Sequence, residues 1–109
     1  MSPPLEPTRV RDNMFVKIHS TERDTILAAC DEHLVGMTFR EGGKRLDVSE
    51  IFYKGESLGR DAFIERMKNV SIMNLVGDEV VAIAIEEGYA SEDSVIEIDG
   101  VKHVQVVLL

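Results

Sequence analysis

Hydrophobic and polar residues alternate most clearly near the two ends of the chain. Residues 14–19 alternate between apolar and polar side chains, which predicts a first strand. Two β-rich runs, 94–98 and 101–109, flank Asp99-Gly100. Both turn residues tolerate positive φ angles, so this pattern predicts a β-hairpin. We expect the second run to point alternate residues inward, namely Val104, Val106 and Leu108.

Helical spacing of apolar residues is found in three further segments. The first helix is predicted to begin after an N-cap at Ser20 or Thr21 and to end at Gly36. Its apolar residues follow the helical repeat and are Ile26, Leu27, Cys30 and Leu34. A second helix is predicted over 59–69. A third is predicted over 79–87, with Asp78 as its cap and Gly88 at its stop position.

The remaining segments are predicted to form a second hairpin and two short elements. Residues 37–41 and 44–49 flank two glycines, which predicts a second hairpin. The aromatic segment 51–56 fits a strand, an edge or a packed loop, and 71–76 fits a strand or the entry to a helix. Hairpins mixed with helices favour an α+β fold, here one small domain with a mainly antiparallel or mixed sheet and about three helices.

Composition limits the class of protein more than it identifies one. The chain has 109 residues, enough for one core, which we place in a single domain over 14–109. Residues 1–13 hold all three prolines and are predicted to be a flexible leader. No apolar run is long enough to span a bilayer, and one cysteine forms no internal disulfide, so we expect a cytoplasmic protein.

The formal net charge of −8 is unevenly distributed. Residues 69–109 hold one basic and eight acidic residues, whereas residues 37–68 hold seven basic and six acidic ones. An anionic chain repels nucleic acid at long range, but the basic middle third could form a local patch.

A nucleophilic site is the catalytic alternative that the sequence allows. Cys30 lies three residues before His33, and a thiol beside an imidazole is the minimal arrangement for an activated nucleophile. His103 is a second possible base, with Asp31 or Glu56 in support. Because Cys30 also falls on an apolar stripe, a buried structural thiol is the competing interpretation.

Metal and nucleotide sites have little support in the sequence. Close-spaced pairs of the C-x₂-C kind that bind zinc are absent, the Cys30-x-x-His33 spacing alone is weak support for zinc, and the glycine-containing segments lack the phosphate-binding pattern. We therefore predict no metal and no cofactor.

One face of the predicted sheet combines aromatic, cationic and amide side chains. Such a mixture suits stacking on bases and contact with phosphates in single-stranded RNA. A solvated face, or one covered by another subunit, is the alternative. The residues predicted to bind are Phe15, Lys17, His19, Arg40, Arg45, His103 and Gln105.

Several short strings together resemble one protein family. They are Met14 to His19, Cys30-Asp31-Glu32, Leu46 to Glu50 running into Phe52 to Glu56, Asn74 to Gly77, and Gly100 to Gln105. This combination resembles the archaeal family catalogued as domain of unknown function 424. The resemblance implies an archaeal, cytoplasmic, single-domain α+β protein, and it brings no established activity, cofactor or catalytic residue.

Three functions therefore remain open at this stage. The first is a non-catalytic binding module for RNA or a translation-associated nucleoprotein. The second is an enzyme with the Cys/His nucleophile. The third is a structural or regulatory subunit that pairs through its C-terminal strand, with a homo-oligomer as one such assembly.

Overall fold

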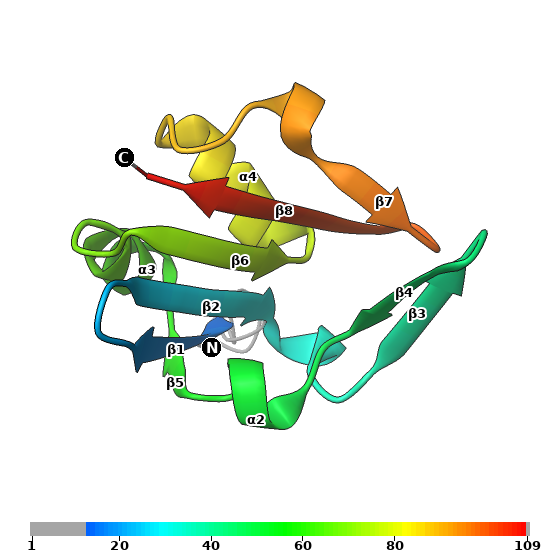
Figure 1. Cartoon of the computed structure of the whole chain (residues 1–109), viewed down its shortest axis with the longest axis horizontal. Coiled ribbons are helices and arrows are strands. Elements are labelled where there is room, and N and C mark those ends of the chain that lie inside the picture. The colour runs from blue at the N-terminus through cyan, green and yellow to red at the C-terminus, as the bar shows by residue number, and fades with distance from the viewer. Residues whose placement is uncertain (1–12, 109) are drawn as a thin grey trace, which may run out of the picture.

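A computed structural model of the chain describes residues 13–108. Six strands form one mixed sheet in the order β5-β1-β2-β6-β8-β7 (Figure 1). Their bounds are β1 Met14–Ser20, β2 Thr25–Asp31, β5 Glu56–Leu58, β6 Ile72–Val76, β7 Ile96–Ile98 and β8 Val101–Val107. Central strands β2 and β6 are parallel, and every other neighbouring pair in this sheet is antiparallel.

The other elements lie around this sheet. A separate two-stranded ribbon consists of β3 Thr38–Glu41 and β4 Lys44–Asp47, and it projects from one end of the molecule (Figure 1). The α-helices are α2 Glu50–Tyr53, α3 Arg60–Met67 and α4 Asp78–Glu86, and two 3-10 helices span Glu32–Leu34 and Glu92–Ser94. Within the described residues, no helix has the length and apolarity needed to cross a membrane.

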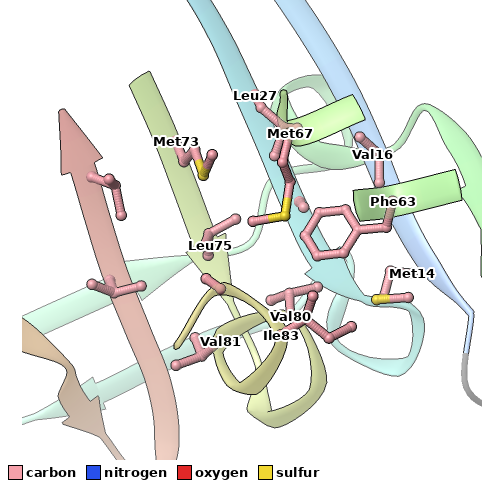
Figure 2. Close-up of a cluster of buried hydrophobic side chains, with 14 residues drawn as sticks. Met14, Val16, Leu27, Phe63, Met67, Met73, Leu75, Val80, Val81 and Ile83 are labelled. Atoms are coloured by element: carbon pink, nitrogen blue, oxygen red, sulfur yellow. The ribbon is translucent and has the colours of Figure 1, made fainter. Parts of the chain in front are cut away.

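The main core lies between the first face of the sheet and the helices α3 and α4. Phe63 and Met67 of α3 and Val80 of α4 are all fully buried there against the strands (Figure 2). The strands contribute Met14, Val16, Leu27, Ala29, Met73, Leu75, Val104 and Val106. Alternation along each strand directs these side chains to one face, which the two helices close.

A smaller core lies on the second face, which is turned toward the viewer in Figure 1. Ala28, Cys30 and Val76 of the sheet are fully buried there, beneath Tyr53 of α2 and Leu46 of the ribbon. The cover comes from one short helix and one ribbon, so it extends over only part of the sheet.

The predicted helix between residues 20 and 36 is wrong, because this segment forms a turn and strand β2. The Thr21 hydroxyl accepts a hydrogen bond from the Asp24 amide at 2.9 Å, but this bond stabilises the turn between β1 and β2. Leu27 to Cys30 are 0% exposed, because β2 is buried on both faces. A strand in that position carries a continuous apolar run without the alternation that sequence analysis looks for.

The other predicted elements are confirmed, with one exception. The first strand, both hairpins and the helices near 59–69 and 79–87 form as expected, and residues 71–76 form strand β6. The aromatic segment 51–56 was expected to be a strand or loop, but its beginning lies in α2. Ser49 caps this helix by accepting a hydrogen bond from the Phe52 amide at 3.3 Å. The α+β class, the mixed sheet and the number of α-helices are as predicted, although α2 takes the place of the helix expected before Gly36. The predicted leader, except Asn13, lies outside the described residues.

Candidate binding surface on the second sheet face

Three rows of side chains cross the second face of the sheet. The strand register places Phe15, Cys30, Val76 and His103 in the first row. The second row contains Lys17, Ala28, Asn74 and Gln105, and the third contains His19, Ile26, Ile72 and Val107. Alternation along the strands places all twelve side chains on the same face.

Helix α2 and the ribbon cover one part of these rows. Leu46, Val48 and Tyr53 pack over Ala28, Cys30 and Val76, which therefore have no contact with solvent. Tyr53 is 5% exposed, and burial raises the pKa of its hydroxyl to about 12. This part of the face is a second core.

The remainder of the second face is open, and we call it the open corner. It consists of six residues of β2, β6 and β8: Ile26, Ile72, Asn74, His103, Gln105 and Val107. Val107 is 66% exposed, and Gln105 donates a hydrogen bond to the Asn74 amide oxygen at 2.7 Å. His103 donates from Nδ1 to the Leu75 carbonyl at 2.9 Å. The open corner therefore combines aliphatic side chains with a pair of linked amides.

Five of the seven predicted binding residues do lie on this face, but helix α2 engages two of them. Lys17 donates from Nζ to the Ile51 carbonyl at 2.7 Å. His19 donates from Nε2 to the Phe52 carbonyl at 2.9 Å and stacks on the Phe52 ring, with centroids 4.7 Å apart. Phe15 packs at the margin of the second core, where Lys54 lies 5.9 Å from its ring centroid. His103 and Gln105 belong to the open corner.

The other two predicted residues, Arg40 and Arg45, lie on the ribbon. They are directly opposite each other, on the exposed side of the β3–β4 pair. Arg45 forms a salt bridge with Asp47 at 3.0 Å, and Thr38 and Arg45 both donate hydrogen bonds to the Asp47 carboxylate, which lowers its pKa. The structure therefore does not join these arginines to the open corner.

The environment of Cys30 does not activate its thiol. Cys30 is 0% exposed, and burial, together with the neighbouring charges of Asp31 and Glu32, raises the pKa of the thiol to about 12. His33 lies in the 3-10 helix beyond the end of β2, and His103 lies two strands away, a separation of roughly 10 Å. A low thiol pKa and a base within hydrogen-bond reach are both required for a nucleophile.

The acids proposed to support that nucleophile have other partners. Glu56 accepts two hydrogen bonds from Arg66, at 3.0 and 2.9 Å, and its pKa is lowered by them. Asp31 is 4% exposed and accepts hydrogen bonds from the backbone N–H groups of Glu79 and Val80, at 3.0 and 3.1 Å. It therefore caps α4 from β2, a role that the sequence analysis had given to Asp78.

Sequence analysis missed most of the open corner. Ile26 was placed on a helix, and the strand containing Ile72 and Asn74 was left open between two alternatives. Val107 could have been identified from the sequence. Alternation along the second strand of the predicted hairpin places Val107 on the same side as His103 and Gln105. Among the described residues, no group of three or more histidine, cysteine or acidic side chains is arranged to hold a metal ion.

The fold and this surface define a small α+β protein with one closed and one partly open sheet face. The chain belongs to the family described as "Protein of unknown function (DUF424)", whose sequence model matches residues 18–109, so the resemblance found in the sequence is confirmed. The structure is similar to the crystal structure of an uncharacterized conserved protein from Methanopyrus kandleri, with a TM-score of 0.70 and 29% identity. That match covers 89% of this chain and 94% of the other. No curated protein matches the chain in sequence.

Proposed function

We propose that this protein is a non-catalytic binding module that uses the open corner to bind another protein. The observation that carries the proposal is the part of the third row that α2 does not cover, Ile26, Ile72 and Val107, in which Val107 is 66% exposed. Its neighbours Ile26 and Ile72 are only partly buried, beside the linked amides of Asn74 and Gln105. Aliphatic surface next to amides is suited to burial against a protein.

The distribution of cations favours a protein partner over RNA at this surface. RNA binding depends on lysine and arginine contacts with phosphates. Lys17, the lysine on the second face, is held by the Ile51 carbonyl beneath α2, and none of the six residues of the open corner is a lysine or an arginine. The open corner therefore lacks the charge that would hold a phosphate backbone.

RNA binding is a second candidate function, at the ribbon. Arg40 and Arg45 face each other across the two strands, and Lys44 stands next to the turn. Arg40 forms no salt bridge among the described residues. An exposed two-stranded ribbon with cations on one side is a known shape for contact with nucleic acid.

Site-specific photo-crosslinking in the native host distinguishes these candidates. A photoreactive amino acid replaces Val107 in the open corner, Arg40 on the ribbon, or Glu65 on α3 as an exposed control. We expect a protein adduct from position 107 and none from position 65. The captured protein, once purified, should bind the wild-type chain and bind Val107→Lys at least tenfold more weakly, with the melting temperature unchanged.

Each other outcome of the crosslinking contradicts the proposal. RNA captured from position 40, with no protein adduct at position 107, would favour the second candidate. Equal adducts from positions 107 and 65 would show that the open corner has no selectivity. Equal affinity of the captured protein for wild type and Val107→Lys would place its binding site elsewhere.

A further inference from the structure

Strand β8 is longer than its neighbour β7, which leaves part of one edge unpaired. β8 pairs with β6 over residues 103–107, but with β7 only over residues 101–103. The β7 pairing ends where Ile96 lies opposite His103. Beyond that point, no strand of the described chain lies on the outer side of β8 (Figure 1).

The backbone of this edge presents hydrogen-bonding groups to solvent. The Gly77 amide donates to the Lys102 carbonyl, and the Leu108 amide donates to the Ser71 carbonyl, both at 2.8 Å. Even-numbered residues of β8 therefore bond toward β6, and odd-numbered residues bond toward the other side. The N–H and C=O groups of Gln105 and Val107 point to the free edge and have no hydrogen-bond partner among the described residues.

Two hollows flank the free edge, one on each side of the sheet. A hollow of about 430 Å³ on the first-face side lies between β8 and the segment 88–91 that contains Tyr89 and Ala90. A hollow of about 270 Å³ on the second-face side is lined by Ile96, His103 and Gln105. Side chains of an added strand would point alternately to the two faces, so each hollow could take one set.

The surroundings of the edge are acidic. The segment 88–91 is flanked in sequence by four exposed acids, Glu86, Glu87, Glu92 and Asp93, of which Glu86 forms a salt bridge with Arg60 at 2.6 Å. The chain has no lysine or arginine between Lys68 and Lys102. Two copies of this chain paired through β8 would bring two such acidic regions together, whereas a basic segment would be attracted to the acids.

We infer that the free edge of β8 binds an extended, lysine- or arginine-rich segment of a partner protein as an additional strand. Hydrogen bonds to the backbones of Gln105 and Val107 would supply affinity, and the two hollows and the acids would supply selectivity. This inference rests on the proposed function and deepens it, because it adds the mode of binding and the charge of the partner.

A pair of synthetic peptides tests both parts of the inference. The probe is a fluorescently labelled ten-residue peptide of alternating valine and lysine, and its counterpart has glutamate in place of lysine. Fluorescence anisotropy should show binding of the basic peptide that weakens as salt is added, and at least tenfold weaker binding of the acidic one. Amide exchange at Gln105 and Val107 should slow at least tenfold when the basic peptide binds.

Backbone variants separate strand addition from other contacts. Val107→Pro removes an N–H that faces the free edge, so it should weaken peptide binding at least tenfold. Val107→Thr retains the N–H and serves as the matched control for the change of side chain, so peptide binding should be at least fivefold weaker for Val107→Pro than for Val107→Thr. If Val107→Pro unfolds the chain, methylation of alternate backbone nitrogens of the peptide gives the same test on the wild-type protein.

The possible failures of this inference can be told apart from failure of the proposed function. Binding that withstands both Val107→Pro and peptide methylation would exclude strand addition. Equal binding of the two peptides would exclude a basic partner, and a dimer abolished by Val107→Pro would make a second copy the occupant. If neither peptide binds while the crosslinked protein still requires Val107, the inference fails and the proposed function remains.

Discussion

The two faces of the six-stranded sheet are covered to different extents. On the first face, two α-helices of eight and nine residues cover the strands β1, β2, β6 and β8, and every residue of that core except Val106 is at most 2% exposed. On the second face, a four-residue helix and a ribbon close one part and leave the open corner. The same strands serve both faces, so the difference lies in what covers them.

This difference separates side chains that stabilise the fold by packing from side chains that remain exposed to solvent. Side chains of the first face are fixed by packing, and replacing them costs stability. Gln105 and Val107 of the open corner are exposed, so their side chains contribute little to folding. Val106 and Val107 show the contrast within two successive residues, because they are 8% and 66% exposed.

The largest expected effect comes from the centre of the first face. Phe63→Ala removes a ring that is 0% exposed, and we expect the free energy of unfolding to fall by about 3–5 kcal/mol. Phe15→Ala on the second face is the matched control and should cost clearly less, because Phe15 is only partly buried. Urea unfolding of the two variants measures both losses. Equal losses would show that the two faces contribute alike.

An intermediate effect is expected from the neighbouring valines of β8. Val106→Thr places a hydroxyl without a partner in the first-face core and should cost about 1–3 kcal/mol. Val107→Thr changes an exposed side chain and should cost less than about 0.5 kcal/mol. Thermal melts of the two variants under one buffer condition provide the measurement. A loss at position 107 as large as that at position 106 would mean that the open corner is covered.

The smallest effect concerns Asp31, which links β2 to the start of α4. Asp31→Ala leaves two backbone N–H groups without their acceptor and should cost about 0.5–2 kcal/mol. Burial raises the pKa of Asp31 above its ordinary value of 3.8, so the folded chain holds this proton more tightly than the unfolded chain. The corresponding stabilisation is complete below pH 3.8 and is lost as the pH rises through the folded pKa.

The pH dependence has its own control in Asp31→Asn, which does not titrate. The wild-type chain should lose stability relative to Asp31→Asn as the pH rises from 3.8 through the folded pKa, after which the difference should become constant. Urea unfolding of both chains from pH 3 to pH 8 measures this difference. The contributions of the other acids to the pH dependence cancel, because both chains contain them. A difference that grows in favour of the wild type with rising pH would contradict a raised pKa.

Most elements with a local signal could be predicted from the sequence. The turn Asp99-Gly100 adopts the expected positive φ angles, 53° and 80°, and the hairpin around it forms. Strand β2 could not be predicted, because burial on both faces removes the alternation that marks a strand. That burial depends on β6 and α2, which are far from β2 in sequence.

The candidate site was predictable only in part, for a related reason. Phe15, Lys17 and His19 were placed on the correct face because β1 alternates clearly. Whether that face is open depends on the position of α2, and no local pattern shows that Lys17 and His19 bond to its carbonyls. The positions of Arg40 and Arg45 could not be predicted either, because they depend on the direction of the ribbon, which is set by tertiary contacts.

The parallel pairing of β2 with β6 also affects the order in which the chain can fold. Each of the hairpins β1–β2, β3–β4 and β7–β8 joins residues that are close in sequence, and such contacts form at little entropic cost. Ile26 and Ile72 are neighbours in the sheet but are separated by 46 positions along the chain. The middle of the sheet therefore requires closure of a long loop that contains the ribbon, α2, β5 and α3. The β2–β6 pair has the largest sequence separation of the strand pairs in this sheet, so its formation carries the largest cost of loop closure.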